Sequence, residues 1–217
     1  MRALTWGTVC LLAATGIVGA AEPRAWKLSR DSLGRLPPGW LAARTGAGEG
    51  SVWKILADET APSKTGLVLA QTAAGPSALF NLCVMQEGNY KDVELRVNFK
   101  AVKGDNDQGG GFVWRYQDAK NYYVARFNPL EDNYRFYHVI DGKRTQLVTK
   151  EEIKIPTGTW HALAVKHVGD KIECFLDGKK QLEAKDKTIQ KPGKVGLWTK
   201  ADAQTHFDDF RVTDLGR

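Results

Sequence analysis

The chain has 217 residues, of which 42% are hydrophobic and 26% are charged, and its net charge at pH 7 is +6. This length suits one domain with a sizeable core. An excess of basic over acidic residues can indicate nucleic-acid binding, but the lysines are scattered through turns and strand edges. We therefore interpret the charge as surface solvation and expect no nucleic-acid partner.

Residues 1–20 have the pattern of a secretory signal peptide. The start is positively charged, residues 9–18 are mostly apolar, and Val18-Gly19-Ala20 supplies small residues for cleavage. The apolar run is too short to span a membrane, and no other segment comes near that length. We predict cleavage after Ala20 or Ala21, a periplasmic or secreted location, and one domain over residues 21–217.

Short segments of strand composition follow one another through this domain. Residues 92–100 alternate between apolar and polar side chains, which indicates a strand with one buried face. Pairs such as Asp141-Gly142 favour tight hairpins. The predicted strands cover residues 25–30, 40–43, 51–56, 66–70, 78–85, 92–100, 112–116, 122–128, 134–140, 145–148, 160–168, 171–176, 180–183, 195–199 and 207–212, with single helical turns at 150–153 and 186–190. This series predicts an all-β antiparallel sandwich, with the loop at 105–108 crossing between its sheets.

The segment from Gly109 to Asn133 concentrates arginine and aromatic residues in one hairpin. Alternate residues of a strand point to opposite faces. Phe112, Trp114 and Tyr116 are therefore expected on the core face, and Arg115 on the other face. On the next strand, Arg126 shares a face with Tyr122. Two arginines on one face would offer donors to hydroxyl groups or a carboxylate. The predicted ligand contacts are Arg115, Tyr122, Tyr123, Arg126, Asn128, Glu131, Asn133 and Lys200. The alternative is that the arginines pair with Glu131, Asp132 or Asp118 and tie loops down.

Several segments resemble the concanavalin A-like, or laminin-G-like, superfamily. They are Trp160–Gly178, Gly193–Trp198 and Phe207–Val212, together with Trp-Arg-Tyr at 114–116 and Asn-Tyr-Tyr at 121–123. Within that superfamily, the chain most resembles the bacterial domain group named for 3-keto-disaccharide hydrolases. The resemblance covers nearly the whole mature chain. It implies a two-sheet antiparallel jelly-roll sandwich in which the concave sheet carries any carbohydrate site.

The resemblance leaves open whether the domain is an enzyme. Glycosidases usually hold two carboxylates about 5–5.5 Å or roughly 6.5–9.5 Å apart. The Glu-x-Asp-x-x-Glu strand of family-sixteen glucanases does not occur in this sequence. A reaction on a 3-keto-glycoside would instead need a base beside the ketone and a group that polarises it. The candidate bases are Glu131, Asp132, His138 and Tyr123, and the candidate polarising groups are Arg115 and Arg126.

Four further residues carry structural expectations. Related jelly rolls often hold calcium near the last strand, so the resemblance implies Asp208 as a calcium ligand. The favoured alternative is that Asp208 caps a backbone segment or pairs with Arg211 or Lys200. Export permits a disulfide between Cys83 and Cys174, but two cysteines without framework spacing favour buried free thiols. Trp198 is expected in the interior rather than as a sugar platform.

These observations predict an exported domain that binds or processes carbohydrate. A structural calcium is the one cofactor considered, and carbohydrate is the expected partner. The alternatives are a hydrolase or lyase acting on 3-keto-glycosides, and a structural adhesion domain without a small ligand. The sequence does not indicate the sugar or the oligomeric state.

Overall fold

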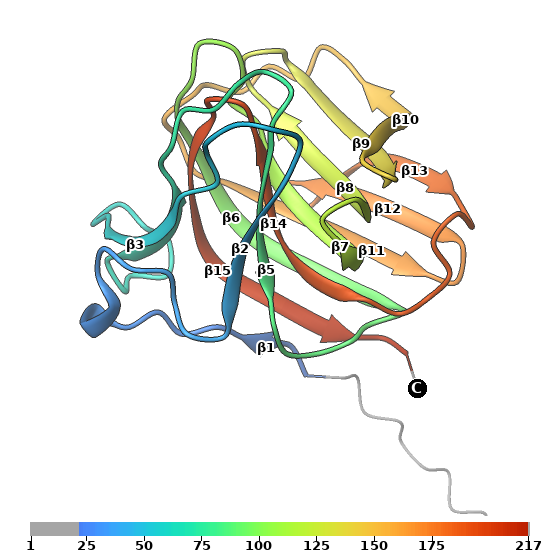
Figure 1. The fold of residues 1–217 in the computed structure, drawn as a ribbon, viewed down its shortest axis with the longest axis horizontal. Helices are drawn as coiled ribbons and strands as arrows, with labels where there is room; N and C mark the ends of the chain where they lie inside the picture. Colours follow the sequence, from blue (N-terminus) through green and yellow to red (C-terminus); the bar gives the residue numbers. More distant parts are fainter. Residues whose placement is uncertain (1–21, 217) are drawn as a thin grey trace, which may run out of the picture.

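The computed structural model describes residues 22–216 as two antiparallel β-sheets packed face to face (Figure 1). The predicted signal peptide, residues 1–20, lies outside the described residues. The described part contains one 3-10 turn, Arg30–Ser32, and no α-helix. Across residues 22–216 we find no helix of the length and apolarity that crossing a membrane requires.

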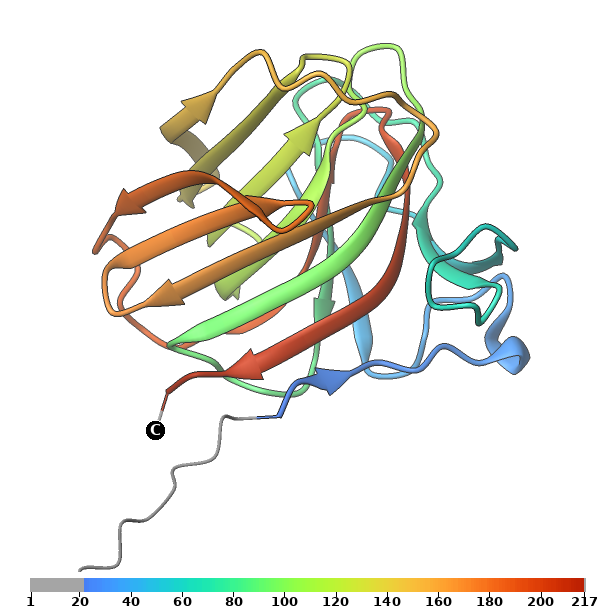
Figure 2. The same ribbon diagram turned by 180° about the vertical axis from the view of Figure 1, so that it is seen from behind.

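Sheet A has the strand order β13-β12-β11-β6-β15-β4-β3, and β1 pairs with β15 (Figure 2). Its strands are β1 (Arg24–Ala25), β3 (Trp53–Ala57), β4 (Leu67–Gln71), β6 (Val93–Lys103), β11 (His161–Val168), β12 (Lys171–Leu176), β13 (Lys179–Lys185) and β15 (Gln204–Asp214). Every recorded pairing in this sheet is antiparallel apart from a single bridge between Leu33 and Ile55.

Sheet B has the order β10-β9-β8-β7-β14-β5-β2. Its strands are β2 (Trp40–Thr45), β5 (Phe80–Met85), β7 (Gly110–Asp118), β8 (Asn121–Asn128), β9 (Asn133–Ile140), β10 (Lys143–Lys150) and β14 (Lys194–Lys200). The loop at 105–108 joins β6 in sheet A to β7 in sheet B, so the predicted crossover is confirmed. The predicted jelly-roll sandwich is confirmed as well.

The main core lies between the sheets and follows from period-two alternation. On β6, Val93, Leu95, Val97 and Phe99 are buried while the residues between them point outward. From sheet B, Trp114 stacks against Tyr123 and Phe136 at centroid distances of 5.6 Å. Cys83 and Cys174 are both buried free thiols, in agreement with the favoured expectation.

A second buried cluster belongs to sheet B alone and covers its outer face. Its members are Phe80, Leu82, Val84, Val113, Tyr122, Val124, Tyr137, Val139 and Trp198. Arg144 on β10 lies 4.9 Å from the ring centroid of Phe80 on β5, although five strand spacings, roughly 24 Å in a flat sheet, separate these strands. Sheet B is therefore strongly curved, and its outer face is the concave one.

Some predicted elements differ from the structure. The first strand covers only Arg24–Ala25 rather than 25–30, because the chain turns into the 3-10 turn at Arg30–Ser32. The segments 150–153 and 186–190 contain no helical turn. Lys150 instead completes β10, and residues 188–190 are held by contacts to Asp186 and Tyr123.

Candidate functional site on the concave sheet

The turn between β8 and β9 brings four predicted ligand residues together. Arg126 is buried on the concave face, where its Nη2 donates to Glu131 Oε2 at 2.7 Å and its Nη1 donates to Asn133 Oδ1. The Asn128 side chain accepts the Leu130 N–H at 3.0 Å and shapes the turn. The ion pair of Arg126 with Glu131 is the pairing that the sequence offered as the alternative to ligand contact, and ligand binding by these residues stays a prediction.

A buried carboxyl that the sequence did not single out lies beside this turn. Asp107, at the end of the crossover loop, is fully buried, and its Oδ1 accepts the Gly109 N–H at 2.7 Å. Its Oδ2 lies 3.6 Å from Nζ of Lys200, which β14 contributes. Lys200, one of the predicted ligand residues, therefore joins the site through its ion pair with Asp107.

The two carboxyls of this region are shifted in opposite directions. Burial raises the pKa of Asp107, and the charges of Arg126 and Lys200 only partly offset that effect. Burial also raises the pKa of Glu131, but the charge and hydrogen bond of Arg126 outweigh it, so the net pKa of Glu131 lies below its usual value. One carboxyl that holds a proton more readily beside one that stays ionised is the arrangement that acid–base chemistry uses.

Arg144 completes the site from the far edge of the sheet. Its guanidinium carbon lies 4.4 Å from the Tyr137 ring centroid, 4.9 Å from that of Phe80 and 6.0 Å from that of Trp198. Burial lowers its pKa. Its Nη1 is buried and has no hydrogen-bond partner within residues 22–216.

We call Asp107, Arg126, Glu131, Arg144 and Lys200 the concave cluster. Besides Arg144 Nη1, other polar atoms around it are buried and have no hydrogen-bond partner in the described part of the chain; they are Asp107 Oδ2, Arg126 Nε, Asn128 Nδ2 and Trp198 Nε1. Most buried polar atoms in proteins are hydrogen-bonded. These atoms are closed off from solvent, and the parts of the cluster that reach the surface belong to Glu131, Arg144 and Lys200.

Arg115 does not join the concave cluster. Its φ is 43°, and the pairing of β7 shifts register there against both β8 and β14. This bulge reverses the predicted parity, so Tyr116 packs on Tyr122 on the concave side and Arg115 turns toward the rim of the core. Arg115 donates to the carbonyls of residues 91, 169 and 189, which is the loop-tying role considered as the alternative.

The remaining candidate bases lie apart from the concave cluster or contribute only to its turn. Tyr123 and His138 are paired across β8 and β9 on the core side of the sheet, and both approach Asp186. Asp132 has a φ of 52° and forms part of the β8–β9 turn. Tyr122 is buried, with its hydroxyl 2.7 Å from that of Thr45. Among the candidate bases, Glu131 alone is placed in the concave cluster.

Asp208 and Trp198 were both given structural expectations. Asp208 accepts the backbone N–H of Ser63 at 2.8 Å and its hydroxyl at 2.6 Å, which agrees with the expected capping role, and it does not pair with Arg211 or Lys200. Residues 22–216 contain no group of three or more His, Cys, Asp or Glu side chains that could hold a metal ion, so calcium binding stays a prediction. Trp198 is buried, but in the cluster on the concave face rather than between the sheets.

A family model for the 3-keto-alpha-glucoside-1,2-lyase-like domain matches residues 43–213. The chain belongs to this family. The match spans both sheets and includes every member of the concave cluster. The comparison with curated proteins finds no match.

Solved structures similar to this lyase-like domain show its fold. The carbohydrate-binding module CBM66 from Bacillus subtilis is 19% identical with a TM-score of 0.66, over 81% of this chain and 96% of the module. A Bacillus licheniformis beta-glucanase is 16% identical with a TM-score of 0.58, over 91% and 99% of the two chains. A Bacillus subtilis protein with a galectin-like fold is 11% identical with a TM-score of 0.55, over 81% and 89%.

Sequence reasoning missed two members of the concave cluster in this lyase-like domain. Asp107 carried a weak signal, since it sits in an acidic and amide-rich loop directly before Gly109–Gly111, where the backbone must approach its neighbours closely. Arg144 carried none, because only the curvature of sheet B brings β10 over β5.

Proposed function

We propose that the domain is exported and that the concave cluster binds a carbohydrate. The observation that carries the proposal is Nη1 of the half-buried Arg144, which has no hydrogen-bond partner within residues 22–216. Sugar hydroxyls both donate and accept hydrogen bonds, so one ligand could pair with this donor and with the exposed part of the Glu131 carboxylate. Three cations against two carboxyls favour a neutral or weakly acidic sugar over a strongly charged one.

The family description and the position of Glu131 in the concave cluster favour one specific reaction as a second candidate. The family description suggests a 3-keto-glucoside as the substrate and elimination across C1 and C2 as the reaction. Glu131, held ionised by Arg126, would take the C2 proton, which is acidic because it neighbours the ketone. The electron pair forms the C1–C2 double bond, the C1–O bond breaks, and the departing oxygen takes a proton from solvent water. Arg144 or Lys200 would polarise the ketone.

Calorimetric titration separates these possibilities. The probes are methyl α-glucoside, its 3-keto derivative, levan oligosaccharides and laminari-oligosaccharides. We expect one of them to bind, Arg144→Met to weaken that binding at least roughly tenfold, and Lys143→Met, an exposed neighbour on the same strand, to leave it unchanged. Absence of binding to every probe, or binding unaffected by Arg144→Met, would refute the concave site.

The reaction has its own readout. Elimination from the 3-keto probe yields a conjugated enone, which absorbs in the near ultraviolet, whereas simple binding gives no new absorbance. We expect Glu131→Gln to abolish the absorbance change while retaining measurable binding of the 3-keto probe. If the wild-type domain binds that probe and no enone forms, the domain is a binding module and the elimination reaction is refuted.

A further inference from the structure

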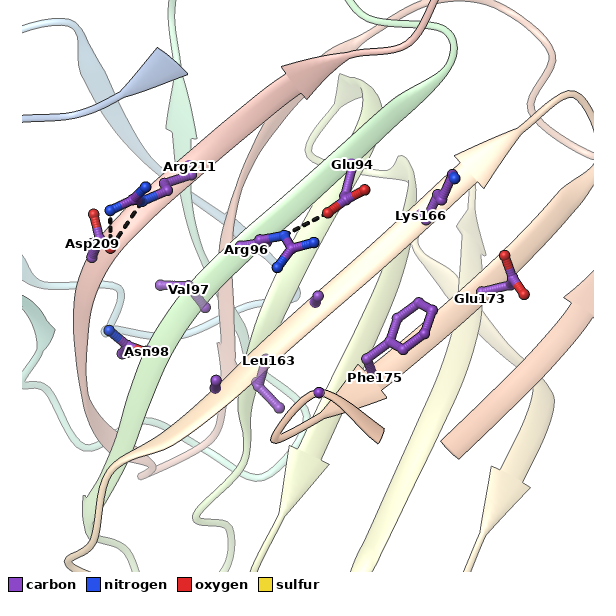
Figure 3. A pocket seen from close by; sticks show the side chains of 13 residues that line it. Glu94, Arg96, Val97, Asn98, Leu163, Lys166, Glu173, Phe175, Asp209 and Arg211 are labelled. Atoms are coloured by element: carbon purple, nitrogen blue, oxygen red, sulfur yellow. Dashed lines mark hydrogen bonds and ion pairs between the residues drawn. The ribbon is translucent and has the colours of Figure 1, made fainter. Parts of the chain in front are cut away.

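The outer face of sheet A carries a groove of about 510 Å³ (Figure 3). The concave cluster lies on the outer face of sheet B, on the opposite side of the sandwich. It crosses β15, β6, β11 and β12, which lie side by side inside the sheet. Figure 3 shows the labelled side chains of Arg96, Lys166 and Phe175 on three neighbouring strands. These residues occupy outward positions, alternating with the core residues of the same strands.

Small side chains create the hollow. Across the strands, Phe175 pairs with Ala164, and Ala164 pairs with Arg96. Ala162 occupies the next outward position on β11, so two alanines lie where long side chains usually cover an exposed sheet. The half-buried Phe175 ring therefore has open space beside it instead of a neighbour of its own size. An aromatic ring beside a hollow floor can stack against the apolar face of a ring-shaped ligand.

Register shifts border the groove on both sides. The β12–β13 pairing shifts between Cys174 and Phe175, directly at the aromatic residue. The β15–β6 pairing shifts between Asp208 and Arg211, and Asp209 there has a φ of 52°. Bulges bend a strand locally and redirect its side chains, and they are frequent next to binding sites. Both ends of the hollow are thus shaped by departures from regular pairing.

The charges that line the groove cancel. Three cations face three carboxyls around it: Arg96, Lys166 and Arg211 against Glu94, Glu173 and Asp209. A polyanion such as nucleic acid would lack the net positive charge that it needs. An added peptide strand is disfavoured as well, because the groove crosses interior strands whose backbone groups are already paired, whereas strand addition needs a free edge.

We propose that this groove is a second saccharide-binding surface, specific for a neutral oligosaccharide. One sugar ring stacks on Phe175 above the alanine floor, and its hydroxyls pair with the side chains of Arg96, Asn98 and Lys166, which line the same groove. The inference does not rest on the concave cluster, because the two sites share no residue and lie on different sheets. A domain with both sites would hold a chain-like glycan at one face while the other face engages a second saccharide.

Amide chemical-shift mapping of the nitrogen-15-labelled protein tests the proposal. The probes are cellohexaose, laminarihexaose, xylohexaose and levan hexasaccharide, each titrated separately, with a heparin hexasaccharide as the charged comparison. We expect at least one neutral probe to shift the amides around Ala164 and Phe175. Ala164→Arg fills the hollow and should remove these shifts, and Phe175→Ala should weaken binding roughly tenfold. Val168→Ala, an exposed position on the same strand, should change neither.

The spectra also report whether each variant is folded, since an intact fingerprint away from the groove shows that it is. Shifts around Arg144 and Glu131 report the concave cluster independently, so failure of one site is distinguishable from failure of the other. The proposal is overturned if no neutral probe moves the groove amides, if the heparin hexasaccharide alone does so, or if the shifts persist in folded Ala164→Arg.

Discussion

Arg126 and Arg144 lie on the same concave face, but substitution by methionine should lower the stability of the domain at Arg126 and leave it nearly unchanged at Arg144. Methionine keeps most of the length and apolar volume of arginine while removing the charge and all five donors. Arg126→Met removes a side chain that binds Glu131 at 2.7 Å and also holds Asn133. Arg144→Met removes a side chain for which the described residues provide neither hydrogen bond nor ion pair, only aromatic contacts.

The expected costs follow from these contacts. Removing one partner of a fully buried ion pair costs about 3–5 kcal/mol. The Glu131 side chain is 33% exposed and keeps Arg135 at 3.2 Å, so we reduce the expected cost of Arg126→Met to about 2 kcal/mol. Arg144→Met loses cation–π contacts worth roughly 1 kcal/mol and regains a similar amount because a charge is no longer buried. Its free energy of unfolding should therefore stay within about 1 kcal/mol of wild type.

Urea denaturation followed by tryptophan fluorescence at pH 7 measures both variants, with Lys143→Met as the exposed control on β10. The expected order of stability is Lys143→Met and Arg144→Met near wild type, with Arg126→Met clearly lower. A loss of 2 kcal/mol or more in Arg144→Met would mean that Arg144 is a structural residue, and the argument that its donors serve a ligand would fail.

Three further predictions concern the scaffold. Burial raises the pKa of Asp58, but its hydrogen bonds with Lys100, Thr60 and His206 together outweigh this, so the net pKa lies well below normal. Asp58→Asn should therefore cost about 3 kcal/mol at pH 7. The difference in free energy of unfolding between wild type and Asp58→Asn should shrink as pH falls below about 4, because Asp58 is then increasingly protonated in the unfolded chain. A difference that stays the same at every pH in urea denaturation would contradict this prediction. Cys83 and Cys174 should resist Ellman's reagent in the native protein and both react in urea, whereas unreactive thiols after unfolding would indicate a disulfide. Arg115→Met should cost about 3 kcal/mol, and a loss under 1 kcal/mol in the same assay would argue against its loop-tying role.

Period-two alternation made most of the fold predictable. On β6 the alternation determines which face is buried, since a shift of a single residue would bury Glu94 and Arg96 and expose Leu95 and Val97. The crossover at 105–108 was predictable too, because its polar composition fits neither a strand nor a tight hairpin. Strand boundaries were predicted less well, since pairing with a neighbour extends a strand beyond its apolar residues.

The parity of β7 was predictable only as far as Trp114. Beyond it, the residue at 115 takes a positive φ that satisfies register with two neighbouring strands at once, and the local sequence carries no mark of this. The one signal lies far along the chain. Gly193 packs directly against the backbone of residues 115 and 116, so any side chain there would collide with the bulge. A glycine at such a distance indicates a close approach only after the pairing is known.

Burial alone does not separate structural arginines from ligand-binding ones in this domain, but an account of their donors does. Arg115 is buried, with donors bound to three backbone carbonyls and to Asp92. Arg126 is equally buried, but its Nε has no partner in the described chain, and Arg144 makes no hydrogen bond there at all. The cation–π contacts of Arg144 only offset the cost of its unpaired buried donor, which is why we propose that a ligand uses this donor. For the same reason we propose Arg144, at the far edge of sheet B, as a ligand contact in place of Arg115. The curvature of sheet B, rather than proximity in the sequence, brings Arg144 to the site.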